Sequence, residues 1–416
     1  MGIRSSASDR IKPAMNSLTF PVPGPSTPRT SGALNFLRGV GVALVRVVVV
    51  LVLGGLVFGG AVARAAGLQA RNVFLITTDG LRWEEVFGGI DETLISKEYG
   101  NVSDTNRLRS EFWRPTPEAR REALFPFLWG TLAKRGQIWG NRNLGSEVRV
   151  SNGHNFSYPG YSEFLTGVAD ARIDSNDKRL NENTNVFEWL SHRPGFEGRV
   201  AAAANWDVMP WILNAPRAGF PVWSGFEVPE GTRRFKGSEA LEELVEHGRT
   251  IWKDVMLDTF AARAAREMFV GLRPRAFYVS LGETDDWAHE GRYERVIRAA
   301  HEYDRFVAKL WQAVQSTDGY RDQTVFVLTV DHGRGPAPVA WKDHGRQIPG
   351  AAAIWFAVIG PDTRPLGERK GTAPVIQAQI ASTVAALVGE DFRSGVPAAA
   401  AAVAEVVGPA GSGLGR

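Results

Sequence analysis

Short apolar runs alternate along the chain with longer stretches in which apolar residues recur at helical spacing. Four runs are continuous and rich in β-branched or aromatic residues: 72–78, 277–281, 324–330 and 353–359. Such runs are typical of strands buried on both faces of a parallel sheet. Helical spacing predicts helices over 118–135, 238–273, 292–315 and 375–388. The alternation predicts an α/β fold, a three-layer sandwich with a largely parallel central sheet and helices on both faces.

The N-terminal 66 residues differ from the rest and form a leader. Arg38 and Arg46 precede an uncharged run, Val47–Ala63, which ends in the small-residue pattern Ala-Val-Ala. This plan predicts a secretory signal peptide and therefore an exported protein, periplasmic or extracellular. The run is also nearly long enough to span a bilayer, so a membrane anchor is the alternative. We expect membrane association only if the leader is not cleaved.

Composition narrows the chemistry of the remaining chain. Residues 1–63 carry a surplus of five positive charges, whereas the whole chain carries only +3, so the remainder carries −2. No nucleic-acid-binding surface is therefore expected. The chain has no cysteine, which excludes disulfides, thiol nucleophiles and Cys-based metal sites. We expect a catalytic domain over 67–393 and a frayed Ala/Gly-rich tail over 394–416.

Polar side chains follow three of the predicted strands, at the point where each strand ends. Asp79 follows the first strand, Asp285 and His289 follow the second, and Asp331 and His332 follow the third. Ligands of open α/β sheets gather at the carboxyl ends of the strands. These side chains are therefore expected at one edge of the sheet.

The chemistry of these residues suits a metal site. The spacing of Asp285 and His289 places both on one face of a helical turn, and carboxylate plus imidazole is a zinc-type ligand set. Gly333 lets the chain turn so that the neighbours Asp331 and His332 can share a site, and His344 follows soon afterwards. Each motif alone also fits a turn, a helix cap or a surface pair. Together, behind successive strands, they predict a metal centre.

A nucleophile is also predicted. Ser157 precedes a Pro-Gly bend and a short apolar helix. Backbone N–H groups at a helix N-terminus favour the anionic oxygen that forms on attack. A serine cap or a Pro-Gly turn is the alternative interpretation.

The order of these motifs resembles the alkaline phosphatase superfamily, in particular its type I phosphodiesterase/nucleotide pyrophosphatase and phosphoglycerate mutase-like metalloenzyme branch. The segments 79–82, 157–160 and 283–289 are similar to that branch's motifs. The resemblance implies two divalent metal ions, zinc or manganese, with Ser157 between them as nucleophile and ligand. It implies that one ion is held by Asp285, His289 and His344, and the other by Asp79, Asp331 and His332.

The resemblance also implies an exported hydrolase of small-molecule phosphate esters, acting through a Ser-linked covalent intermediate. Diester, pyrophosphate and monoester substrates stay open, with a slight preference for diesters and pyrophosphates. A membrane-anchored phosphoryl transferase and a catalytically silent binding protein are the alternatives. The sequence leaves the oligomeric state open. Tyr161 stands where a sulfatase has arginine, which argues against that class.

Further residues are candidates for shaping the pocket. Asn176 is the nearest candidate for the asparagine that assists the nucleophile in the phosphodiesterase branch, and Asn181, Asn183 and Asn185 in the same stretch are alternatives. Arg82 and His154 are possible phosphoryl donors. Trp206 and Trp223 belong to an aromatic segment that could line a pocket, but tryptophan is so often buried that we expect core packing.

Overall fold

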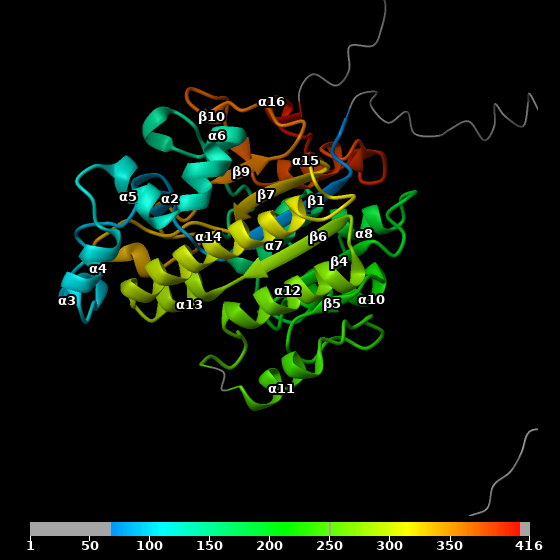
Figure 1. Cartoon of the computed structure of the whole chain (residues 1–416), viewed down its shortest axis with the longest axis horizontal. Coiled ribbons are helices and arrows are strands. Elements are labelled where there is room, and N and C mark those ends of the chain that lie inside the picture. The colour runs from blue at the N-terminus through cyan, green and yellow to red at the C-terminus, as the bar shows by residue number, and fades with distance from the viewer. Residues whose placement is uncertain (1–67, 249–250, 408–416) are drawn as a thin grey trace, which may run out of the picture. The chain divides into compact units, whose positions relative to one another are not determined.

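An eight-stranded sheet, ordered β10-β2-β9-β7-β1-β6-β4-β5, forms the centre of the structure (Figure 1). The computed structural model describes residues 68–248 and 251–407, so the run on which the export prediction depends lies outside them. The strands of this sheet are β1 Asn72–Thr78, β2 Gln137–Trp139, β4 Val200–Ala204, β5 Val222–Trp223, β6 Ala276–Leu281, β7 Thr324–Val330, β9 Phe356–Ile359 and β10 Gly367–Glu368. Within it, β9 runs antiparallel to both of its neighbours and the other pairs are parallel. The predicted α/β fold with a largely parallel sheet is confirmed.

Three of the four predicted strands form as expected, and the fourth is divided. Strand β1 pairs with β6 on one side and β7 on the other, and every residue of the three is buried. The run 353–359 instead supplies two strands: β9 joins the main sheet, whereas β8 Ala353–Ile354 joins a small sheet ordered β11-β3-β8. The other strands of that small sheet are β3 Val148–Arg149 and β11 Val375–Ile376.

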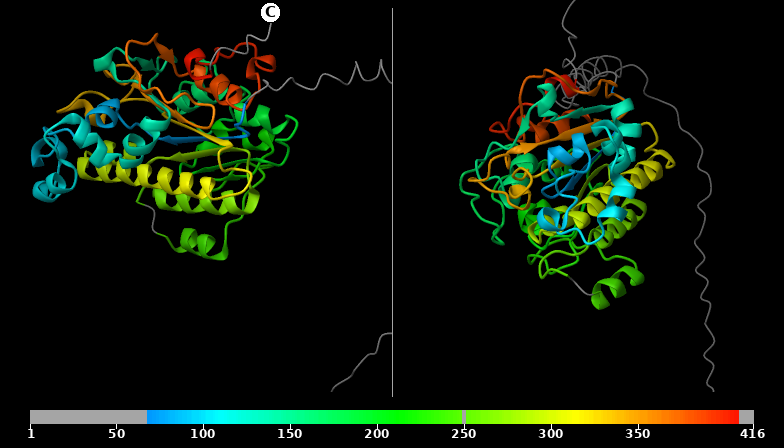
Figure 2. Two further views of the ribbon diagram at one scale, coloured as in Figure 1. Left: turned by 45° about the horizontal axis from the view of Figure 1, so that its top comes forward. Right: turned by 90° about the vertical axis from the view of Figure 1, so that its left-hand side faces the viewer.

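Helices cover both faces of the main sheet. On one face, α12 Asp258–Leu272 contacts β4 and β6, and it also contacts α14 Tyr293–Gln315. On the other face, α8 Val186–Ser191 contacts the same two strands, and α7 Ser157–Thr166 and α15 Gln379–Ala386 pack beside it. In Figure 2 the long yellow helix α14 lies on the opposite side of the sheet from the red-orange α15. The predicted layer order is therefore confirmed.

The remaining helices are short. They are α2 Trp83–Gly88, α3 Lys97–Gly100, α4 Thr105–Phe112, α5 Pro117–Leu124, α6 Ala133–Arg135, α9 Met209–Ile212, α10 Ala215–Ala218, α11 Glu239–His247, α13 Glu283–His289 and α16 Ala404–Val407. A π-helical segment, Leu128–Leu132, precedes α6, and 3₁₀ turns occupy Arg142–Leu144, Ala340–Lys342 and Phe392–Ser394. None of the helices in the described ranges is long and apolar enough to cross a membrane.

Three predicted helices and the predicted tail need correction. In the stretch 375–388, Val375–Ile376 forms β11 and α15 begins only at Gln379. The stretch 118–135 is broken after Leu124, next to Pro126, whose ring cannot continue an α-helix. The stretch 238–273 contains two helices, because α11 ends at His247 and α12 begins only at Asp258. The expectation that the chain frays past Arg393 is wrong up to Val407, where Val403 and Val406 are buried in the core. The extents predicted for leader and catalytic domain stay predictions.

Candidate active site

The register of the central strands brings the predicted site residues together. Thr78 lies beside Val330 of β7 and Leu281 of β6, so Asp79 and Asp331 emerge next to each other at the carboxyl edge. Helix α13 begins just after β6 at the same edge. Gly80, with a positive φ of 59°, makes this convergence possible because a Cβ there would lie 2.6 Å from Asp285 Oδ1.

The first group of ligand atoms, which we call the strand-end group, consists of Asp79, Asp331 and His332. His332 Nε2 lies 3.3 Å from Asp79 Oδ1 and 3.2 Å from Asp331 Oδ2. His332 Nδ1 donates to the Gly333 carbonyl at 3.0 Å. The ring therefore carries its lone pair on Nε2, which faces the carboxylates. All three side chains are buried. The group is therefore fixed in position by the sheet itself.

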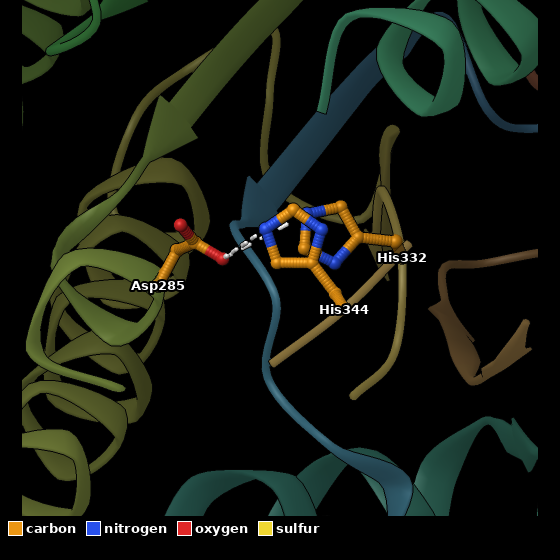
Figure 3. A group of neighbouring side chains, drawn as sticks. All are labelled: Asp285, His332 and His344. Atoms are coloured by element: carbon orange, nitrogen blue, oxygen red, sulfur yellow. Dashed lines mark ion pairs between the residues drawn. The ribbon is translucent and has the colours of Figure 1, made fainter. Parts of the chain in front are cut away.

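The second group, which we call the loop-side group, consists of Asp285, His289 and His344. His289 Nε2 lies 3.1 Å from Asp285 Oδ2 and 2.9 Å from His344 Nε2. In Figure 3 the Asp285 carboxylate points from α13 toward the rings of His344 and His332, which stack with centroids 4.0 Å apart. Because Asp285, His332 and His344 offer ligand atoms within 4.8 Å of one another, His332 lies between the two groups.

The three carboxylates of the site are not equivalent. Burial, followed by the charge of Asp285, raises the pKa of Asp79 well above its usual range. Burial and then Asp79 raise the pKa of Asp331 in the same way. Although burial opposes it, the Arg334 guanidinium lowers the pKa of Asp285 well below its usual range. Burial, and then His332, lower the pKa of His344 to about 2, so its imidazole is neutral and able to coordinate.

These residues fit divalent cations. Asp79 Oδ1, Asp331 Oδ2 and His344 Nδ1 are buried and have no hydrogen-bond partner. Buried polar atoms are nearly always paired, so carboxylate oxygens in this condition indicate a missing positive partner. Carboxylate and imidazole donors in two adjacent groups suit zinc or manganese.

Ser157 lies at the strand-end group. It is the first residue of α7, as the sequence predicts, and is 6% exposed. Its Oγ lies 3.3 Å from His332 Nε2. Ser162, the other serine of this helix, instead accepts a hydrogen bond from Asn181 and does not line the pocket. The structure thus brings all seven predicted site residues to one place, and their catalytic and ligand roles stay predictions.

A pocket opens over these groups. Its lining residues are Asp79, Ser157, Tyr161, Asn176, Asn205, Trp206, Val208, Asp254, Val255, Gly282, Asp285, Asp286, His289 and His344. Asn176 accepts a hydrogen bond from the Tyr158 N–H at 2.9 Å, which leaves its amide NH₂ as a donor. Arg82 and His154 do not line the pocket, because Arg82 pairs with buried Glu85 and His154 contacts Arg346.

Several pocket and site residues were not predicted from the sequence. Trp206 packs against the core, as expected, and also lines the pocket, which was the alternative, whereas Trp223 is buried as expected. Asp286 lines the pocket, and burial, together with Asp285, raises its pKa to about 9. Arg334 is also buried and donates to the carbonyl of Lys342. Its position two residues after His332 was the available signal, but a charge next to a turn is usually solvent-exposed.

Comparisons with known proteins identify the family and the fold of the chain. The model of the type I phosphodiesterase/nucleotide pyrophosphatase family matches residues 96–349, more than half of the chain. The fold is similar to that of wild-type alkaline phosphatase PafA, with 12% identity, coverage of 82% of this chain and 100% of that chain, and a TM-score of 0.52. A phosphonate monoester hydrolase of Agrobacterium radiobacter has 14% identity, coverage of 82% and 78%, and a TM-score of 0.48. No curated protein matches the sequence. The chain belongs to the type I phosphodiesterase/nucleotide pyrophosphatase family, a family of phosphoester hydrolases, and its fold is that of an alkaline phosphatase.

Proposed function

We propose that the protein is an exported phosphodiesterase with two divalent metal ions, zinc or manganese, and that Ser157 is its nucleophile. The observation that carries the proposal is the position of Ser157 Oγ, 3.3 Å from His332 Nε2 at the junction of two groups of metal-type ligands. The strand-end group would hold one ion and the loop-side group the other. Bound metals would lower the pKa of the serine hydroxyl and neutralise charge on the phosphoryl group.

The proposed reaction has two steps. In the first, the Ser157 alkoxide attacks phosphorus, a new O–P bond forms, and the bond to the leaving alcohol breaks in line with it. In the second, water attacks the phosphorus of the serine phosphodiester, the bond to the Ser157 oxygen breaks, that oxygen takes up a proton from the water, and the product phosphate monoester is released. Asn176, with its amide NH₂ free, is placed to donate to a phosphoryl oxygen. The residues of the chain therefore supply position and hydrogen bonds, which is most of what phosphoryl transfer requires.

The pocket favours diesters over monoesters. A monoester dianion brings one more negative charge than a diester and needs additional cationic donors. Among the described residues that line the pocket there is no lysine or arginine, and Asp254 adds negative charge. We therefore infer that the second ester group of a diester is accommodated better than a second phosphate charge.

A chromogenic substrate pair tests the proposal. Purified, metal-loaded protein should hydrolyse bis(4-nitrophenyl) phosphate with a larger kcat/KM than 4-nitrophenyl phosphate, and labelled substrate should leave phosphorus on Ser157. Label on Ser162, or loss of activity on both esters despite full metal content, would contradict the assignment. The latter result would favour a binding protein on the same fold.

Export is the second part of the proposal. It depends on Arg38, Arg46 and the apolar run that ends at Ala63. The intact mass of the protein recovered from its native host should correspond to a chain that begins after the leader. A full-length species in the membrane fraction would instead support the membrane-anchored phosphoryl transferase.

A further inference from the structure

One wall of the pocket is built from two loop segments that pair with each other. The Asp207 N–H donates to the Asp254 carbonyl and the Met256 N–H donates to the Asn205 carbonyl, both at 2.9 Å. Trp206 and Val255 form an antiparallel bridge between these two bonds. The pairing fixes Trp206 and Asp254 beside each other at the pocket, close to α13, which carries the site carboxylate Asp285. This wall is not needed to hold either predicted metal.

Asn205 in this wall presents an acceptor that nothing in the described protein satisfies. The residue is 1% exposed, and its Nδ2 donates to the Met256 carbonyl at 2.7 Å and to Asp258 Oδ1 at 2.9 Å. Because both partners can only accept, the amide orientation is fixed and Oδ1 faces the other way. Oδ1 has no hydrogen-bond partner, and Asn205 lines the pocket. A buried acceptor of this kind calls for a donor on the substrate.

The charge of the wall indicates which donor it takes. Apart from the predicted metal ligands and Asp286, which its burial keeps protonated, the charged side chain that the described residues contribute to the pocket lining is Asp254. Trp206 adds an aromatic ring, which attracts cations through its face. An acceptor, a carboxylate and an indole ring together are complementary to an ammonium group that carries N–H donors.

We propose that this wall is a subsite for a primary ammonium group, and that the protein acts on phosphodiesters whose alcohol carries such a group. The proposal rests on the proposed function and narrows it to aminoalkyl phosphodiesters. The ammonium group donates to Asn205 Oδ1 and is neutralised by Asp254, while the phosphodiester lies at Ser157. Trp206 covers the methylene groups between them.

Three substrates with one leaving group test the subsite. They are 4-nitrophenyl esters of phosphate whose second alcohol is 2-aminoethyl, propyl or 2-(trimethylammonio)ethyl. We expect the aminoethyl ester to have a kcat/KM at least about tenfold above that of the propyl ester, which is equal in size. The trimethylammonio ester has charge but no N–H donor, so it should fall between the two. A ratio of aminoethyl to propyl near one would overturn the proposal, and a trimethylammonio ester that equals the aminoethyl ester would overturn the role of Asn205.

Substitution of Asp254 tests whether the preference for the aminoethyl ester depends on the wall. Asp254 is exposed, so Asp254→Asn should fold normally, and it should reduce the aminoethyl-to-propyl ratio severalfold. Asp254→Lys should invert that ratio. The matched control is Asp318→Asn, an exposed acid in the loop before β7, at the opposite edge of the sheet, which should keep the wild-type ratio. An unchanged ratio in both Asp254 variants would contradict the subsite.

Binding separates this proposal from the proposed function. Calorimetric titration of the metal-loaded Ser157→Ala protein with the aminoethyl and propyl esters measures recognition without turnover. Tighter binding of the aminoethyl ester supports the subsite even if no ester is hydrolysed by the wild-type protein, in which case the hydrolase proposal fails alone. Equal binding of the two esters by a protein that hydrolyses both would overturn the subsite and leave the phosphodiesterase proposal standing.

Discussion

The strand-end group and the loop-side group offer similar ligand atoms but are built differently. Asp331 and His332 continue directly from β7 and are 0% exposed, and Asp79 continues from β1. In the loop-side group, the His289 side chain is 46% exposed at the end of α13. A site whose ligands are held by buried strands loses less freedom when a metal binds. We therefore infer that the strand-end group is the tighter and more persistent metal site.

The largest effect is expected from Ser157, which lies beside His332 at the strand-end group. Ser157→Ala removes the proposed nucleophile and should lower kcat by about a thousandfold or more. Metal content should stay near the wild-type value because six ligand side chains remain. A steady-state assay measures kcat, and elemental analysis measures the metal content of the variant. Wild-type turnover in the variant would remove Ser157 from the mechanism.

Two histidine substitutions test whether the two groups hold separate metal ions. His332→Ala should lower the content of both metals and the activity, because His332 Nε2 lies within 3.3 Å of Asp79 and 3.7 Å of Asp285. His289→Ala should lower the content of one metal only, because its contacts are confined to the loop-side group. Elemental analysis of the two purified variants decides the matter. Equal loss in both would show that the groups act as one site.

The rate of metal release to a chelator compares the two groups with a smaller expected effect. Treatment of the loaded protein with a chelator should release metal in two phases, the first from the exposed loop-side group and the second from the buried strand-end group. His289→Ala should lack the fast phase. Release in one phase from the wild-type protein would contradict the difference in accessibility.

The strand-end group is also the part of the site that the sequence predicts best. Asp79, Asp331 and His332 follow apolar runs that can hardly be anything but buried strands, and parallel register then forces their side chains together. His344 is harder, because it comes after a 3₁₀ turn whose path depends on Trp341, buried against distant parts of the chain. The pocket wall around Asn205 is out of reach, because it depends on pairing with a segment fifty residues later. The same limit explains why the sequence does not decide between the core and the pocket for Trp206.

The smallest effect is expected from Asp304, a buried carboxylate that belongs to neither group. Its titration provides a reference for how the stability of the protein depends on pH. Asp304 of α14 accepts hydrogen bonds from the Phe127 and Leu128 N–H groups, both at 2.8 Å, yet burial raises its pKa to about 7. Between about pH 4 and pH 7 the unfolded chain has lost this proton while the folded protein keeps it. Stability contributed by Asp304 is therefore present at low pH and declines as the pH rises through this window.

Asp304→Asn should flatten that decline. The amide has one carbonyl oxygen in place of two acceptors, so at pH 5 the variant should be less stable by about 1 kcal/mol, the cost of a lost hydrogen bond. At pH 8, where the wild-type protein must bury a charged carboxylate, the deficit should shrink or reverse. Urea unfolding of the metal-free proteins at the two pH values measures both differences. If the deficit grew with pH instead, the Asp304 carboxylate would be stabilised by its two N–H donors in the charged form. Carboxylates of the strand-end group, which lack such donors on Asp79 Oδ1 and Asp331 Oδ2, would then differ from it more sharply still.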